Sequence, residues 1–252
     1  MIECKRISAS YEKSKEIIKD LSIMVENGKI LVLLGNNGSG KTTLLRAING
    51  EISVRGDIFI DGISQKELKS AEKAKNTAIL PQILPIPSGV TVREAVAFGR
   101  TPYTGYFGKL SVHDNEMIDG ALERAGITRL QDKYLTDISG GERQKAFLAM
   151  LIAKGSKNII LDEPTSNLDS KNKRELFEFM REMKKTGHAI LAVLHDLNDA
   201  ISVADTLCVM ADGKIEFYGD TDSFIKSDVP QRHFGSNPIV ADENGKKRIF
   251  FI

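Results

Sequence analysis

The stretch Gly35-Asn36-Asn37-Gly38-Ser39-Gly40-Lys41-Thr42-Thr43 decides the fold that this sequence predicts. It follows an apolar run, Ile30 to Leu34, and leads into an apolar-periodic segment, Leu44 to Ile48. This order indicates a strand, a glycine loop and a helix. The glycines let backbone N–H groups turn toward an anion, where a side chain would block the approach of phosphate oxygens. The stretch therefore predicts a phosphate-binding loop.

Two side chains of this loop carry further chemistry. Lys41 can reach the β- and γ-phosphates of a nucleotide, and the Thr42 hydroxyl can ligate Mg²⁺. The helix that begins near Lys41 adds the positive end of its dipole. The alternative is a glycine-rich turn that matches the pattern by chance, and the strand and helix on either side argue against it.

Composition and charge exclude several classes of protein. Lys+Arg number 35 and Asp+Glu 34 in 252 residues, a formal charge of +1, so no basic field favours a nucleic-acid partner. Cys4 and Cys208 are too few and too distant for a disulfide framework, which fits a reducing compartment. No signal peptide is apparent, and the longest apolar run, Ala146 to Ala153, is too short to span a bilayer. Any work at a membrane would therefore need a partner.

Strand and turn signals predict antiparallel sheet at the N-terminal side. We expect strands at Ile2 to Ile7, Leu21 to Val25 and Ile30 to Leu34, with Asn27-Gly28 as a hairpin turn between the last two. A second strand pair is expected near Ile52 to Val54 and Asp57 to Ile60, followed by a helix over Ser64 to Lys75. Tyr11 lies in a polar segment and, from position alone, is expected to be a partly buried rim residue.

Polar side chains follow three predicted strands further along the chain. Gln82 ends Ala78 to Gln82, Asp162-Glu163 follow Asn158 to Leu161, and His195 follows Ala189 to Leu194. The carboxyl ends of buried parallel strands are where open α/β sheets place ligands. Asp162 can hold Mg²⁺ through water, and Glu163 can orient and polarise an attacking water. A lone histidine is more often structural, but strands that end in acidic and imidazole groups favour a functional His195.

The tetrapeptide Ser139-Gly140-Gly141-Glu142 precedes an apolar-periodic helix, Arg143 to Lys154. A capping box explains Ser139 and Glu142, because their side chains can satisfy the first N–H groups of the helix. It does not explain two consecutive glycines. A second close approach of backbone to an anion accounts for them better.

The remaining signals are local. Thr91 to Glu94 predicts a second capping box, and either Asp169 or Ser170 caps a helix over Lys171 to Lys185. The aromatics Tyr103, Tyr106 and Phe107 form a loop that is either a docking surface or half-buried packing. The tail predicts a hairpin at Asp212-Gly213, a short helix over Asp222 to Lys226 and a last hairpin around Asn244-Gly245.

With these residues in view, the chain resembles the nucleotide-binding subunits of ABC transporters over nearly its whole length. The matching motifs are Walker A (Gly35 to Thr43), the Q-loop (Gln82), the signature (Ile138 to Glu142), Walker B (Ile159 to Glu163), the D-loop (Ser166 to Asp169), the H-loop (His195) and the adenine-stacking aromatic (Tyr11). The signature departs from the usual form by Ile for Leu at 138 and Glu for Gln at 142. Both replacements are mild.

Two segments narrow the resemblance. Val92 to Tyr103 and Ile138 to Gln144 are similar to the ATPases of type II importers for iron-siderophore complexes, haem and cobalamin. This match implies that Gln82 and the Arg100 to Phe107 loop lie in a helical subdomain that docks the coupling helices of a membrane permease.

The resemblance implies an α/β fold: a P-loop NTPase core of mixed sheet with helices, an antiparallel β subdomain at the N-terminal side and an inserted helical subdomain. It divides the single domain into a core (1–87 and 157–220), a helical signature subdomain (88–156) and a C-terminal extension (221–252). It implies a peripheral protein at the cytoplasmic face of the cell membrane, with permease subunits as partners and a substrate-binding protein as an indirect one.

The resemblance also implies ATP and Mg²⁺ as cofactors and a head-to-tail homodimer with two ATPs between the copies. Tyr11, Gly35 to Thr43 and Ser139 to Glu142 would bind the nucleotide, Thr42, Gln82 and Asp162 the metal, and Lys41, Gln82, Glu163 and His195 would serve catalysis. Ser139 and Gly141 of the opposite subunit would bind the γ-phosphate of each ATP. His195 would hold the oxygens of this phosphate.

Two rival functions share part of this pattern. A cytosolic ABC ATPase that acts with soluble partners, for example in iron–sulfur cluster assembly, would carry the same catalytic residues. A nucleotide-gated binding module without hydrolysis would not need Glu163 and His195. The transported substrate would never touch this subunit, so the sequence does not identify it.

Overall fold

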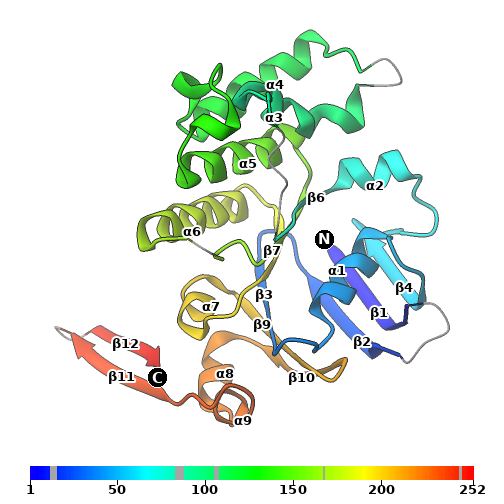
Figure 1. The fold of residues 1–252 in the computed structure, drawn as a ribbon. Coiled ribbons are helices and arrows are strands. Elements are labelled where there is room, and N and C mark those ends of the chain that lie inside the picture. Colours follow the sequence, from blue (N-terminus) through cyan, green and yellow to red (C-terminus); the bar gives the residue numbers. More distant parts are fainter. Residues whose placement is uncertain (12–15, 83–87, 105–107, 167, 244–245) are drawn as a thin grey trace.

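The computed structural model describes residues 1–252 except 12–15, 83–87, 105–107, 167 and 244–245 (Figure 1). The strands are β1 (Ile2–Ala9), β2 (Ile18–Val25), β3 (Ile30–Leu34), β4 (Val54–Ile60), β5 (Ile63–Ser64), β6 (Thr77–Leu80), β7 (Asn158–Asp162), β8 (Ala189–Val193), β9 (Thr206–Ala211), β10 (Lys214–Gly219), β11 (Pro238–Glu243) and β12 (Lys246–Phe251). The α-helices are α1 (Lys41–Asn49), α2 (Ser70–Asn76), α3 (Val92–Ala97), α4 (Val112–Arg124), α5 (Gly140–Lys154), α6 (Ser170–Lys185), α7 (Leu197–Val203), α8 (Thr221–Lys226) and α9 (Val229–Phe234). Three 3₁₀ turns are described, at Phe98–Tyr103, Thr128–Leu130 and Leu135–Asp137.

A six-stranded sheet forms the centre, in the order β10-β9-β3-β8-β7-β6. Its pairs from β9 to β6 are parallel, and only β10 runs antiparallel, along β9. Every residue of β3 and β8 is buried, as their continuous apolar sequences require. Because β3, β7 and β8 are parallel, the residues that follow them lie at one edge of the sheet.

Helices cover both faces of this sheet. On one face, residues of α6, α7 and α8 pack on Ile30, Val32 and Leu34 of β3. On the other face, α1 packs between Leu31 and Leu33 of β3 and a second, four-stranded antiparallel sheet, β2-β1-β4-β5. The P-loop NTPase type of α/β fold with an N-terminal antiparallel sheet, expected from the sequence, is confirmed.

A helical lobe made of α3, α4 and α5 stands apart from the sheets at the top of Figure 1. It has its own apolar core, which includes Val96, Ile118, Leu122 and Ala149. Thr91, Ser111 and Ser139 cap its three helices through capping boxes, which confirms the boxes expected at Thr91 and Ser139. Inside the lobe, Arg100 Nε donates a hydrogen bond of 2.8 Å to Asp114 Oδ1, with both residues buried.

The C-terminal segment ends in the antiparallel hairpin β11–β12, which extends from the body beside α7 and α8 (Figure 1). Phe251 is buried against Phe224, with 5.9 Å between the ring centroids. The Asn198 side chain of α7 binds the Phe251 backbone twice, accepting from its N–H at 2.8 Å and donating to its carbonyl at 3.2 Å. The hairpin is therefore joined to the helix that begins two residues after His195.

Three expectations from the sequence are wrong. Asn27-Gly28 does not form a hairpin, because β2 pairs with β1 while β3 enters the other sheet. The expected second strand pair is a single strand, β4, which crosses Gly56 with a change of register against β1. The helix expected from Ser64 begins only at Ser70, because the buried Gln65 side chain binds the last carbonyls of α1, those of Ala47 and Ile48.

Among the residues that the structure describes, no helix is long and apolar enough to cross a membrane. Tyr106 and Phe107 of the expected aromatic loop lie outside the described residues. Tyr103 is 36% exposed, and its ring lies 3.9 Å from the Arg100 guanidinium.

Candidate functional site

The glycine loop joins the end of β3 to the start of α1, as the sequence predicts. Gly35 has φ +151°, and a Cβ there would lie 2.4 Å from the Met210 carbonyl oxygen and 2.7 Å from Ser39 Oγ. Only glycine fits this position. Ser39 Oγ is buried and has no hydrogen-bond partner in the described part of the chain. Asn36, Asn37 and Gly38 form the exposed crest of the loop, and Gly40 precedes α1 with φ 107°.

Lys41 lies folded back on this loop and is only 7% exposed. Its Nζ donates to the carbonyl oxygens of Gly35 at 2.6 Å and Asn36 at 3.2 Å. Burial lowers the pKa of Lys41, while the nearby carboxylates Glu163 and Asp162 act in the opposite direction. The lysine of the loop and the two carboxylates after β7 are thus close enough to interact electrostatically.

Asp162 is the last residue of β7 and is half-buried. Burial raises the pKa of its carboxyl group, and the adjacent Glu163 raises it further. The pKa is lowered in turn by Lys41, His195 and Arg46, all of which lie near enough to act on it. Side chains that follow three parallel strands therefore meet at one edge of the sheet, as the sequence predicts.

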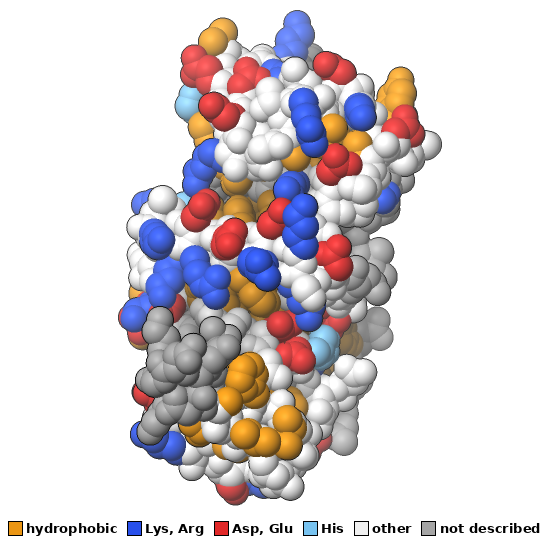
Figure 2. Space-filling model, turned by 90° about the vertical axis from the view of Figure 1, so that its left-hand side faces the viewer, with side chains coloured by type: hydrophobic (Ala, Val, Ile, Leu, Met, Phe, Trp, Pro, Cys, Tyr) orange, Lys and Arg blue, Asp and Glu red, His pale blue; other side chains and the backbone are white. Residues whose placement is uncertain are grey.

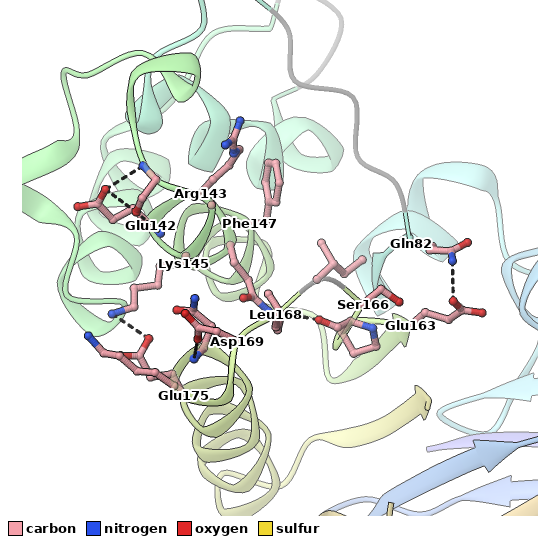
Figure 3. A pocket seen from close by; sticks show the side chains of 18 of the residues that line it. Gln82, Glu142, Arg143, Lys145, Phe147, Glu163, Ser166, Leu168, Asp169 and Glu175 are labelled. Carbon is pink, nitrogen blue, oxygen red and sulfur yellow. Dashed lines mark hydrogen bonds and ion pairs between the residues drawn. The ribbon is translucent and has the colours of Figure 1, made fainter. Parts of the chain in front are cut away.

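Glu163 is held by one partner on each carboxylate oxygen. His195 Nε2 lies 2.6 Å from Oε1, and Gln82 Nε2 donates to Oε2 at 2.5 Å (Figure 3). The backbone of Glu163 has φ +50°, a conformation that non-glycine residues rarely adopt and that clusters at functional sites. The strained backbone and the two partners fix the direction of this carboxylate.

The residues expected to hold a metal are two neutral side chains, those of Thr42 and Gln82, and one carboxylate, that of Asp162. No group of three or more His, Cys, Asp or Glu side chains in the described residues is arranged to hold an ion. Thr42 and Gln82 are exposed and Asp162 is half-buried, so their oxygens remain accessible. They are hard oxygen donors of the kind that Mg²⁺ accepts, and Mg²⁺ is usually held by one or two carboxylates together with substrate phosphates and water.

The signature turn, residues Ser139 to Glu142, begins α5. Ser139 Oγ accepts from the Glu142 N–H at 3.3 Å, and Glu142 Oε2 accepts from the Ser139 N–H at 3.0 Å. The Ser139 hydroxyl also donates to Glu142 Oε2 at 2.8 Å, and the two bonds that this carboxylate accepts, from the Ser139 N–H and from the hydroxyl, hold the pKa of Glu142 below its ordinary value. The Glu142 carboxylate thus serves the helix cap, with Gly140 exposed and Gly141 half-buried beside it.

A cavity of about 1040 Å³ separates the signature turn from the strand ends. Its lining includes Gln82 and Glu163 on one side, Ser139 to Glu142 on the other, and Asp169 at the start of α6 (Figure 3). No residue of the Gly35 to Thr43 loop lines it. A single copy therefore brings the loop to Asp162 and Glu163 but does not bring it into the cavity of its own signature turn.

The structure adds residues that sequence reasoning missed. Arg46, one helical turn after Thr42, donates to the Tyr11 hydroxyl at 3.2 Å and lies 5.8 Å from the centre of its ring. Asn36 donates to the His233 carbonyl at 3.3 Å and so joins the loop to α9, a helix that the sequence analysis did not predict. The i+4 spacing of Arg46 from Thr42 is a signal that could have been used. For α9 the local signals are Pro230 near the start of the helix and Gly235 directly after its end.

Comparison with known proteins gives three findings. The ABC transporter family model matches residues 18–166. The Petrobactin import ATP-binding protein FpuC of Bacillus anthracis is 36% identical over 253 residues, which cover 100% of this chain and 92% of the relative. The Iron(3+)-hydroxamate import ATP-binding protein FhuC of Bacillus subtilis (strain 168) is 34% identical over 236 residues, which cover 92% and 88%.

The fold agrees with these sequence matches. The structure of a metal-chelate type ABC transporter in an inward-facing conformation superposes with a TM-score of 0.87 at 24% identity, covering 100% of this chain and 96% of the other. At that level of identity the likeness concerns the fold alone. Together with the family match and the two relatives, it establishes that the chain belongs to the ABC transporter family, as an ATP-binding subunit with ATPase activity.

Proposed function

We propose that this ATPase powers a membrane importer for iron-siderophore complexes or chemically similar metal chelates. The observation that carries the proposal is the match, over the whole chain, to a subunit named for petrobactin import, together with the match to one named for iron(3+)-hydroxamate import. The substrate does not touch this subunit, so the assignment rests on relatives and not on a pocket of this chain. Haem and cobalamin are the other cargoes that the resemblance allows.

ATP is proposed to bind along the Gly35 to Thr43 loop, with Tyr11 at the adenine. Lys41 would exchange the carbonyls of Gly35 and Asn36 for the β- and γ-phosphates, because an anionic oxygen is a stronger acceptor than a peptide carbonyl. Thr42, Gln82 and Asp162 would hold Mg²⁺ together with phosphate oxygens. When bound there, the ion would neutralise developing charge on the phosphates.

Glu163 is proposed to orient and deprotonate the attacking water. Its carboxylate has Gln82 and His195 as partners, and a water would either use a second lone pair of one oxygen or take the place of one of these partners. In the second case His195 would be free to hold oxygens of the γ-phosphate. Gln82 would change partners in the same event, which links the start of the helical lobe to the reacting centre.

A second copy of the chain is proposed to complete the site, in a head-to-tail pair. The support is geometric: the loop does not line the cavity that the signature turn faces in its own copy. The phosphate-binding loop of the same copy lies outside the cavity that is lined by Ser139, Gly140 and Gly141. A second copy would bring its own loop, with the phosphates bound to it, to these residues. Glu142, as part of the cap, would fix the turn.

The helical lobe, residues 88–156, is proposed to be the subdomain that docks a permease, with Gln82 and the loop from Arg100 at its base. The apolar core shared by α3, α4 and α5 supports a distinct unit, which also packs on the body through Leu148 and Leu151 of α5. Residues 1–87 and 157–220 would form the core and 221–252 an extension. The protein would lie at the cytoplasmic face of the cell membrane, with a substrate-binding protein as an indirect partner.

The cytosolic alternative is not favoured, because the relatives reported above are named as import subunits. The test is purification of the protein from membranes of its own cells in mild detergent. We expect an integral-membrane permease to copurify, and we expect the reconstituted complex to hydrolyse ATP faster when a binding protein carrying a ferric chelate is added. Recovery only with soluble scaffold proteins would refute the transport proposal. ATPase stimulation by cobalamin or haem alone would reassign the cargo.

A further inference from the structure

The two glycines of the signature turn have different surroundings. A Cβ added to Gly140 would meet no atom within 4 Å. A Cβ added to Gly141 would lie 2.5 Å from Asn172 Oδ1, 2.8 Å from Nδ2 and 2.9 Å from Cγ. Adjacent glycines in one turn therefore have separate reasons to be glycine, and the reason at Gly141 is a neighbour.

The backbone of that neighbour, Asn172, is held by the cap of its own helix. It lies in the first turn of α6, and its N–H donates at 2.7 Å to Oδ1 of Asp169, the residue that caps this helix. Its carboxamide is half-buried, lines the same cavity as the signature turn, and makes no hydrogen bond within the described residues. All the atoms of this side chain beyond Cβ face Gly141, so relief of an added methyl group would require a new χ1 rotamer or a movement of the turn.

Further along α5, Leu148 and Leu151 are buried in one apolar cluster with Phe179 and other residues of α6, and two polar contacts lie between this packing and the turn. Gln144 Nε2 donates to the Pro164 carbonyl at 3.4 Å, and Lys145 Nζ lies 3.0 Å from Glu175 Oε2 (Figure 3). Both use long side chains that can follow a displacement. The contact between Gly141 and Asn172 lies at the turn itself and joins a bare Cα to a short side chain, so a displacement of the turn would act on it directly.

We propose that Asn172 is a positioning residue, which sets the place of the signature turn relative to the start of α6, and that Gly141 is glycine because this fit excludes a Cβ. The effect on hydrolysis rests on the proposed head-to-tail pair, in which the turn contacts a phosphate of the second copy. Asp169, Asn172 and Gly141 then form a continuous series of contacts from the start of α6 to that phosphate. A displacement of about 1 Å is enough to weaken an arrangement of this kind.

The competing explanation is that Gly141, like Gly140, is glycine only to let a phosphate approach. A double-mutant cycle separates the two explanations. It compares the wild type, Gly141→Ala, Asn172→Ala and the double variant, with Gly140→Ala and Gly140→Ala/Asn172→Ala as the matched pair. Alanine at 172 removes the three crowding atoms, keeps the N–H that Asp169 accepts, and has the higher helix propensity.

For catalysis we expect Gly141→Ala to lower kcat by about tenfold or more, and the double variant to return to within about threefold of Asn172→Ala, because residues in contact couple in this range. Asn172→Ala alone should lower kcat by about threefold while nucleotide affinity of the isolated copy stays unchanged. Gly140→Ala should lose activity that Asn172→Ala does not restore. Equal losses in Gly141→Ala and the double variant would overturn the proposal, as would full activity of Gly141→Ala.

Thermal unfolding without nucleotide tests the fit independently of the proposed pairing. Gly141→Ala should lower Tm by about 3 °C, and adding Asn172→Ala to this variant should reverse the shift. The change in Tm caused by Gly140→Ala should be the same with asparagine or alanine at 172. If Gly141→Ala does not fold, refolding in the double variant supports the proposal and continued misfolding refutes it. Failure of the wild type to dimerise with ATP would refute the head-to-tail pair, while these Tm values would still decide the role of Asn172.

Discussion

The Glu163 cluster and the signature turn, both proposed to act at a nucleotide phosphate, are built in different ways. Gln82, Glu163 and His195 follow neighbouring strands of one sheet, and both carboxylate oxygens of Glu163 already have partners. The signature turn begins a helix in a lobe with its own core, across a cavity from that sheet. The surface in Figure 2 narrows between the lobe and the body. The geometry of the Glu163 cluster is determined by the fold of the central sheet. The position of the signature turn is determined by how the helical lobe packs against the body.

The largest expected effect tests the first site. Glu163→Gln keeps the shape of the side chain and removes the base, so we expect hydrolysis to fall by about 10² to 10⁴ while ATP still binds. Phosphate release and equilibrium nucleotide binding are the measurements. Glu178→Gln, at an exposed position of α6, is the matched control. Turnover of Glu163→Gln at the wild-type rate would remove Glu163 from the mechanism.

The next effect tests what holds the lobe together. Asp114→Asn breaks the buried pair with Arg100 and should cost about 3–5 kcal/mol of unfolding free energy, because a buried guanidinium loses its counter-charge. Asp57→Asn breaks an exposed pair with Lys66 and should cost about 1 kcal/mol or less. Urea unfolding of both variants measures the contrast. Equal losses would mean that the lobe does not depend on this pair.

The same carboxylate predicts a pH dependence. Hydrogen bonds from Ser111, and then from Arg100, lower the pKa of Asp114 to about 2. A carboxyl group with a lowered folded pKa contributes stability above its unfolded pKa, near 3.9, and loses it as the pH falls toward the folded value. Wild type should therefore lose stability between about pH 4 and pH 2 more steeply than Asp114→Asn. If the unfolding free energies of the wild type and Asp114→Asn change in parallel over this pH range, Asp114 is not the group responsible.

A smaller effect concerns the loop that serves the first site. Lys41→Ala removes a charged donor to the phosphates and should weaken ATP binding by about 10- to 150-fold. Isothermal titration calorimetry measures this directly. Lys66→Ala removes an exposed lysine far along the chain from the loop and should bind as the wild type does. Unchanged affinity of Lys41→Ala would show that the loop binds nucleotide without its lysine.

The smallest effect concerns the C-terminal hairpin. Asn198→Ala removes both hydrogen bonds to the Phe251 backbone and should cost about 1–3 kcal/mol of stability. Asn237→Ala, at an exposed position in the same segment, should cost about 0.5 kcal/mol or less. Chemical unfolding distinguishes them. A larger loss in Asn237→Ala would mean that the hairpin is held elsewhere.

Much of the architecture could be predicted because its signals are local. The apolar runs of β3, β7 and β8, the polar residues that follow them and the capping boxes all depend on short stretches of chain. The hairpin expected at Asn27-Gly28 failed for a non-local reason: β3 finds parallel partners in β8 and β9, far away in the sequence. The turn residues describe the bend and do not specify which strand pairs with which.

The site could be predicted in part for the same reason. Residue types at strand ends indicated Glu163, His195 and Gln82, and the structure brings them together. Asn172 gave no comparable signal, because its importance comes from a side chain placed by tertiary packing, and the spacing of Arg46 from Thr42 did not indicate its contact with Tyr11. Asn172 contacts Gly141 only because the lobe returns over the start of α6.

The resting contacts of Lys41 have a consequence for how the loop meets its ligand. The Lys41 ammonium group donates to two backbone carbonyls of the loop, and these bonds hold the curve of the loop from within the chain. A loop that is already curved loses less conformational entropy when it binds a triphosphate. A bound triphosphate would replace the carbonyl oxygens of Gly35 and Asn36 as acceptors from Lys41. This replacement favours ligands with a high negative charge, because an anionic oxygen is a stronger acceptor than a peptide carbonyl.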